Sequence, residues 1–132
     1  MIVVDASAMT EMVLMTRRGL LVNARLSDPA IELHAPHLLA VEVAHALRGL
    51  NARGDVSPAR GEMALRALSQ LPIRRWDHEP LLPRVWQLRS AITAYDAIYV
   101  ALAEVLDATV LTTDARLGRS SGHQARIEVV TT

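Results

Sequence analysis

Short apolar segments alternate with longer segments of helical periodicity along the whole chain. Residues 2–4 form an uninterrupted apolar run, which is typical of a central strand buried on both faces. Further strands are predicted over residues 32–35, 72–76, 109–113 and 127–130. Helices are predicted over residues 6–21 with a break at 17–19, and over 38–50, 58–70, 80–92 and 96–106. This alternation favours an α/β domain with a mainly parallel central sheet flanked by helices.

Methionines contribute to the apolar stripes of two predicted helices. The first stripe consists of Met9, Met12 and Met15. Their helical spacing predicts core positions, and the alternative is a groove for a partner helix, in which the adaptable methionine side chain is useful. The helix over residues 58–70 begins at a serine and a proline, a combination that marks a helix start, and is expected to bury Met63 and Leu68.

Residues 93–114 combine a predicted helix and a predicted strand with an acidic residue at each end. Asp96 begins the helix, and its apolar residues as far as Val105 and Leu106 are expected to be buried. The β-branched run that follows is predicted to be a buried strand, and Asp114 comes directly after it. One acid at such a position is more often a helix cap than a functional group. Acids elsewhere in the chain change this interpretation.

The composition fits one globular domain over residues 1–132. Hydrophobic residues make up 51% of the sequence, but no apolar run is long enough to span a membrane. The first residues lack the basic region of a signal peptide, and there is no cysteine, so a cytoplasmic location is expected. The 14 basic and 14 acidic side chains balance, so no global field attracts a polyanion. All basic residues other than histidine are arginine.

Acidic residues follow two of the predicted strands. Asp5 and Asp114 stand at carboxyl ends of strands, where open α/β sheets bind their ligands. If these two converge with Glu42 and Asp96, either protons or a cation must relieve their repulsion. Oxygen ligands without cysteine suit Mg²⁺ or Mn²⁺. Such an ion lowers the pKa of a bound water and offsets charge on a phosphate, which indicates phosphodiester hydrolysis.

Four segments resemble the signature blocks of PIN domains, and most closely those of the VapC-type toxins of bacterial toxin–antitoxin pairs. They are VVDASA at 3–8, EVAHAL at 42–47, YDAIYVALA at 95–103 and LTTDARL at 111–117. The resemblance implies a PIN-like three-layer domain with metal-dependent endoribonuclease activity on single-stranded or loop RNA. It also implies a toxin that forms a homodimer and is neutralised by a cognate VapB-type antitoxin.

The resemblance also implies roles for individual residues. Asp5 and Asp96 are expected to be the main metal ligands, with Glu42 and Asp114 completing the catalytic cluster. Supporting positions are Ser7, Thr112, His45 and Arg89. Arg116 and Arg119 are expected to guide RNA phosphates to the cluster.

Two of the supporting positions carry specific expectations. His45 stands where the family commonly has asparagine, three residues after Glu42, so it is a neighbour able to hydrogen-bond Glu42 or to add positive charge. Arg89 belongs to a Trp86-x-x-Arg89 element that also resembles the family. It is expected to form a buried ion pair near the acids.

Several other site classes fit the sequence less well. Glu42-x-x-His45 also matches the di-iron bundle motif, but that architecture needs a second motif and four long helices. Phospho-receiver domains, aspartyl phosphatases and P-loop hydrolases depend on a lysine, and this chain has none. The remaining alternative is a PIN-like binding module with little or no nuclease activity. The intact set of four acids favours the nuclease.

Overall fold

The computed structural model describes residues 1–132, which form an α/β domain around a five-stranded sheet. The strands are β1 (Ile2–Val4), β2 (Leu33–Pro36), β3 (Ile73–Trp76), β4 (Thr109–Thr112) and β5 (Arg126–Val129). Their order in the sheet is β3-β2-β1-β4-β5, and every neighbouring pair is parallel. The first strand of the sequence is therefore the central strand, as its continuous apolar run predicts. Val3 and Val4 are fully buried there.

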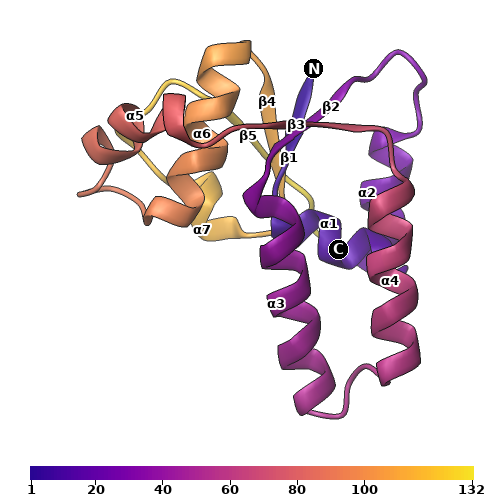
Figure 1. The fold of residues 1–132 in the computed structure, drawn as a ribbon. Helices are drawn as coiled ribbons and strands as arrows, with labels where there is room; N and C mark the ends of the chain where they lie inside the picture. Colours follow the sequence, from indigo (N-terminus) through magenta and orange to yellow (C-terminus); the bar gives the residue numbers. More distant parts are fainter.

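Helices cover both faces of this sheet. They are α1 (Ala6–Leu14), α2 (Arg17–Leu26), α3 (Leu38–Ala52), α4 (Pro58–Gln70), α5 (Leu82–Gln87), α6 (Ala94–Leu106) and α7 (Ala115–Gly118), with a 3₁₀ turn η1 (Glu79–Leu81). Figure 1 shows α5 and α6 on one side of the strands and α1, α2 and α4 on the other, while α3 and α4 project as an antiparallel pair. The predicted α/β class with a parallel sheet flanked by helices is confirmed. None of the helices has the length and apolar surface needed to cross a lipid bilayer.

The helix α6 is the most deeply buried helix of the fold. All residues from Ala97 to Ala103 are buried, as the apolar run predicts. Val105 is an exception, because it is 71% exposed on the last turn, beyond the part of the helix that packs on the sheet. Asp107 ends the helix in the left-handed conformation and turns the chain into β4.

The break between the first two helices lies earlier than predicted. The sequence indicates residues 17–19, but the helix ends at Met15, which adopts a left-handed conformation, and Thr16 caps the next helix by accepting a hydrogen bond from the backbone of Gly19. A Cβ at Gly19 would lie 1.9 Å from the carbonyl oxygen of Glu11, so the two helices meet where only glycine fits. Of the methionine stripe, Met9 is core, whereas Met15 is 73% exposed.

Three other helices also differ from expectation. The helix over Pro58–Gln70 has the predicted bounds and the predicted serine cap, but it buries Ala64 and Leu68 and leaves Met63 68% exposed. The helix packs against both α1 and α3, and Ala64 and Leu68 are its buried residues. The helix expected to reach residue 92 ends at Gln87, and residues 115–118, predicted as surface, form the short α7.

Candidate active site

Asp5 lies at the carboxyl end of the central strand and is 5% exposed. Its backbone N–H continues the sheet by donating to the Leu111 carbonyl at 3.1 Å. One oxygen of its carboxylate accepts hydrogen bonds from the Ser7 hydroxyl at 2.7 Å and the Ala8 N–H at 2.9 Å, and the other accepts from the Thr112 hydroxyl. Asp5 is thus the N-cap of α1 and, at the same time, a carboxylate fixed at the carboxyl end of the central strand.

Ser7 and Thr112 connect this carboxylate to the end of β4. The Ser7 hydroxyl oxygen accepts a hydrogen bond from the backbone of Thr113, and that of Thr112 accepts one from the backbone of Asp114, both at 3.0 Å. The two hydroxyl oxygens are 3.1 Å apart. The structure therefore brings both predicted supporting hydroxyls against Asp5, although they come from opposite ends of the chain.

Glu42 lies on the inner side of α3 and is held by a residue that the sequence did not single out. The hydroxyl of Tyr99, a buried residue of α6, donates to Oε1 of Glu42 at 2.6 Å. Tyr99 follows Asp96 by three residues, so both stand on one face of α6. A tyrosine within an otherwise aliphatic run was the available signal. His45 is exposed and makes no hydrogen bond to Glu42. Its charge offsets only a small part of the rise in the pKa of Glu42, which burial causes first.

Asp96 lies in the first turn of α6, but it does not begin the helix. Thr93 is the N-cap, and its hydroxyl oxygen accepts a hydrogen bond from the Asp96 N–H at 3.2 Å. The carboxylate stands near the positive end of the helix dipole, which favours an anion there. Thr93 is the second residue of the site that sequence reasoning missed.

Asp114 follows β4 and caps α7. Its Oδ1 accepts hydrogen bonds from the backbone N–H of Arg116 at 2.8 Å and from the guanidinium Nε at 3.4 Å. Burial alone would raise the pKa of Asp114, but these hydrogen bonds and the charge of Arg116 outweigh it and hold the pKa below its usual value. Asp114 is the acid of the set that most readily stays ionised.

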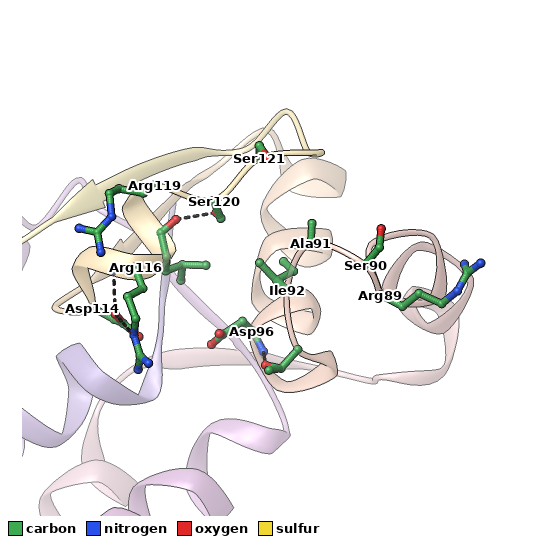
Figure 2. A pocket seen from close by; sticks show the side chains of 12 residues that line it. Arg89, Ser90, Ala91, Ile92, Asp96, Asp114, Arg116, Arg119, Ser120 and Ser121 are labelled. Atoms are coloured by element: carbon green, nitrogen blue, oxygen red, sulfur yellow. Dashed lines mark hydrogen bonds and ion pairs between the residues drawn. The ribbon is translucent and has the colours of Figure 1, made fainter.

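Asp96 and Asp114 face one cavity of about 620 Å³ (Figure 2). Its lining is polar and includes Thr93, Ser120 and Ser121 together with Arg89, Arg116 and Arg119. The side chain of Arg116 is 85% exposed and lies beside Asp114. Figure 2 shows Arg89 at the far rim with its guanidinium pointing away from Asp96.

The prediction that Arg89 forms a buried ion pair is wrong. Arg89 is exposed, its guanidinium donates to the backbone carbonyl of Trp86 at 2.9 Å, and the same group stacks over the Trp86 ring at 4.4 Å from the ring centroid. No acid lies within ion-pair distance of it. The turn that follows α5 directs the side chain back over its own helix rather than toward the sheet.

The four acids form one electrostatic group. The pKa of Asp5, of Glu42 and of Asp96 is raised, in each case first by burial. Repulsion adds to this effect, because Asp96 raises the pKa of Asp5, both of them raise that of Glu42, and Asp114 raises that of Asp96. Such mutual effects require proximity. Asp96 and Asp114 line one cavity, while Glu42 and Ser7 line a neighbouring one, and Asp5 lies at the carboxyl end of the central strand.

This donor set fits a hard divalent cation. All four groups are carboxylates, and the cluster contains uncompensated repulsion that a cation would relieve. No three acidic or imidazole side chains converge tightly enough to enclose an ion by themselves. Mg²⁺ needs no such cage, since it is commonly held by one or two carboxylates and keeps several waters.

Comparison with known proteins agrees with this fold. The PIN domain family matches residues 2–122. Ribonuclease VapC12 from Mycobacterium tuberculosis (strain ATCC 25618 / H37Rv) is 43% identical over 130 residues, which cover 98% of this chain and 99% of that protein. Ribonuclease VapC9 from the same strain is 40% identical over 130 residues, which cover 98% of each protein.

Solved structures of similar proteins have the same fold. PAE2754 from Pyrobaculum aerophilum superposes with a TM-score of 0.70 at 22% identity, over 97% of this chain and 83% of that one. VapC20 from Mycobacterium tuberculosis, a toxin that cleaves the sarcin-ricin loop, gives a TM-score of 0.69 at 14% identity, over 94% and 97% of the two chains. The chain therefore belongs to the PIN domain family and, within it, to the VapC group.

Proposed function

We propose that this protein is a divalent-metal-dependent endoribonuclease toxin that cleaves single-stranded or loop RNA. The observation that carries the proposal is a pair of acids, Asp96 and Asp114, that line one cavity together with three arginines. The charge of Asp114 raises the pKa of Asp96 there. Its relatives at 40–43% identity, which match nearly the whole chain, are ribonucleases. The PIN domain match over residues 2–122 spans the positions of all four acids.

Asp5 and Asp96 are the residues proposed to hold Mg²⁺ or Mn²⁺. When bound, such an ion lowers the pKa of water and offsets the negative charge of a phosphate. The chain itself positions the ligands. Ser7 and Thr112 fix the carboxylate of Asp5 through their hydroxyls, and Thr93 fixes the turn that carries Asp96.

Proton transfer is assigned to Glu42 and electrostatic support to Asp114. Burial and neighbouring acids raise the pKa of Glu42, which makes it a better proton acceptor than an ordinary glutamate. It takes the proton of a water that attacks phosphorus in line. The bond from phosphorus to the leaving ribose oxygen breaks, and that oxygen takes up a proton from solvent. Asp114, whose pKa is low, remains ionised throughout and holds Arg116 at the cavity.

The partner is proposed to be a VapB-type antitoxin. Solved structures with the same fold include VapBC2 from Rickettsia felis bound to promoter DNA, with a TM-score of 0.66 at 12% identity, and FitAcB from Neisseria gonorrhoeae, with a TM-score of 0.63 at 21% identity. A basic side chain from such a partner would relieve the same repulsion that a cation relieves. A homodimer in the cytoplasm remains the expectation, and light scattering of the purified protein measures its oligomeric state.

The test is cleavage of a mixed RNA pool by the purified protein with Mg²⁺, with EDTA and with the Asp96→Asn variant. Cleavage is expected only for the parent protein with metal, and its rate should fall at least about 100-fold in the variant, because loss of even an indirect metal contact costs 10–100-fold. Asp55→Asn is the matched control, since Asp55 is an exposed acid of the α3–α4 turn. Absence of cleavage under every condition, with cation binding retained, would favour the binding module instead.

A further inference from the structure

Trp86 is one of two large aromatic side chains that the fold leaves mostly exposed, and the other is Tyr95. The chain has only two tryptophans, two tyrosines and no phenylalanine. Tyr99 is buried against Glu42, and the indole N–H of Trp76 donates to His34 at 3.0 Å. Trp86, in contrast, is 67% exposed on α5 and its indole makes no hydrogen bond within the protein. An exposed tryptophan of this kind is typical of a binding surface.

One face of the Trp86 ring carries a fixed positive charge. The Arg89 guanidinium lies over the ring at 4.4 Å from its centroid and is anchored by its hydrogen bond to the Trp86 carbonyl. Arg89 forms no ion pair with an acid, so its charge is not neutralised. The ring and the guanidinium therefore form a flat surface that is both aromatic and cationic.

This surface is continuous with the acidic cluster. Trp86 and Arg89 line a groove of about 420 Å³ together with the apolar side chains of Leu82, Val85 and Ile92. Arg89, Ile92 and Thr93 also line the cavity that contains Asp96 and Asp114. The groove and the cavity are therefore adjacent, and Figure 2 shows the shared wall from Asp96 to Arg89.

We propose that Trp86 and Arg89 form a stacking platform for a nucleobase of the RNA strand whose phosphate lies at the acids. This rests on the proposed function, which supplies the substrate class. Aromatic rings and arginine planes hold the bases of single strands, and they tolerate many sequences because every base has a flat face. A duplex cannot use such a surface, since its bases are already stacked, so the platform selects unpaired RNA next to the cleaved bond.

The charge of the groove favours RNA over a second copy of this chain. Arg89, which lines both the groove and the cavity, and Arg119, which lines the cavity, form no ion pair with an acid. A polyanionic strand compensates such charges, whereas an identical chain would place the same arginines against each other in a symmetric contact. The second copy is the competing occupant that the experiment must exclude.

The experiment measures binding of a fluorescein-labelled, mixed-sequence single-stranded RNA by anisotropy. All proteins carry Asp96→Asn and Mg²⁺ is present, so that the probe stays intact. Trp86→Ala and Trp86→Leu are expected to weaken binding about 10-fold, which lies within the range for loss of one base–aromatic stack, while Trp86→Phe retains most of it. Met63→Ala is the matched control and should leave binding unchanged, because Met63 is a large side chain on α4 that is 68% exposed and lines neither the groove nor the cavity.

Cleavage kinetics provide a second readout in the background with Asp96 intact. Trp86→Ala should raise KM with little change in kcat, since the platform positions the strand but touches no reacting atom. If circular dichroism shows that Trp86→Ala does not fold, the RNA affinities of Trp86→Phe and Trp86→Leu are compared instead, and tighter binding by Trp86→Phe supports the platform. Binding of Trp86→Leu as tight as that of the parent overturns the platform. So does unchanged RNA binding by Trp86→Ala together with a fall from dimer to monomer in light scattering.

The platform and the nuclease can fail separately. RNA binding that depends on an aromatic residue at position 86, in a protein that cleaves nothing, would support the platform and reject the nuclease. Cleavage that continues with unchanged KM in Trp86→Ala would support the nuclease and reject the platform.

Discussion

The Tyr99 hydroxyl lies 2.6 Å from a carboxylate oxygen of Glu42, although the two residues are 57 positions apart in the chain. This hydrogen bond joins α6 to α3 at the acidic cluster. Its donor is buried and its acceptor is a carboxylate, so it belongs to the stronger class of hydrogen bonds. It opposes the effect of burial on Glu42, because it lowers the pKa of that carboxyl.

Replacement of Tyr99 by phenylalanine removes the donor and retains the ring. The free energy of unfolding at neutral pH should fall by about 1–2 kcal/mol, since a partly buried carboxylate loses its hydrogen bond. RNA cleavage should fall about 10-fold, in line with other residues that position a catalytic carboxylate. Urea denaturation and cleavage rates measure the two effects. Tyr95→Phe is the control, because Tyr95 is 62% exposed; equal behaviour of the two variants would contradict the role of Tyr99.

A cation should stabilise the folded protein through the acids. Burial, and then repulsion by Asp114, raises the pKa of Asp96. Its ionised form therefore destabilises the fold at neutral pH, and Asp96→Asn should increase the unfolding temperature in EDTA. Mg²⁺ at about 100 times its Kd should stabilise the parent by about 2.7 kcal/mol. The variant should lose this Mg²⁺ effect while Asp55→Asn keeps it. Thermal unfolding with and without Mg²⁺ provides the measurement, and an equal shift in all three proteins would place the cation elsewhere.

The salt dependence of RNA binding tests Arg116 and Arg119. Each phosphate contact on a single strand contributes about 0.7 to the slope of log Kd against log salt concentration. Arg116→Ala and Arg119→Ala, at positions that line the cavity, are each expected to reduce the slope by about that amount. Arg53→Ala, at the distant turn between α3 and α4, should leave it unchanged. A slope that responds to all three substitutions alike would indicate nonspecific attraction rather than a defined path.

The ion pair between Arg84 and Glu104 should make the free energy of unfolding fall in acid. Both oxygens of Glu104 accept hydrogen bonds from Arg84, at 2.8 and 3.0 Å, and one also accepts the N–H of Gln124 at 3.0 Å. The hydrogen bonds from Arg84 are the main reason why the pKa of Glu104 is lowered. The pair therefore stabilises the fold above the ordinary glutamate pKa of about 4.3, and this contribution is lost as pH falls through the lower pKa of the folded state.

Arg84→Met should cost about 1–2 kcal/mol of unfolding free energy at pH 7, and the difference from the parent should disappear in acid. Urea denaturation over a range of pH measures it. The matched control is Arg66→Met, because the pair of Arg66 with Glu62 is 3.4 Å long and both side chains are about 70% exposed. That pair should contribute less than about 0.5 kcal/mol. A difference that persists at low pH would mean that Arg84 acts through packing alone.

The backbone of the fold follows closely from local patterns in the sequence. The central strand is a continuous apolar run because both its faces are covered, and the helix over Pro58–Gln70 has the predicted start because its cap is made by neighbouring residues. Periodicity does not show how near the next helix lies. Met63 is therefore exposed and Ala64 buried in a helix whose apolar residues permit either orientation.

The residues of the candidate site also fall into two groups, those that the sequence locates and those that it does not. Acids at strand ends can be located from the sequence, since the topology of a parallel sheet brings those ends to one edge. Tyr99 and the direction of Arg89 depend on how α6 crosses α3 and how the chain turns after α5. Those are properties of the assembled layers, and no spacing along the chain encodes them.

The position of β1 between β2 and β4 has a consequence for biosynthesis. A growing chain contains Asp5 almost from the start, but Thr112, which binds its carboxylate, is added 107 residues later. The middle of the sheet is thus open on one side for most of translation, and folding must wait for a pairing of very long sequence separation. Before Thr112 has been added, the nascent chain has no assembled carboxylate cluster and cannot cleave RNA. The ribosome that synthesises the protein therefore does not encounter an active nuclease until nearly all of the domain has been made.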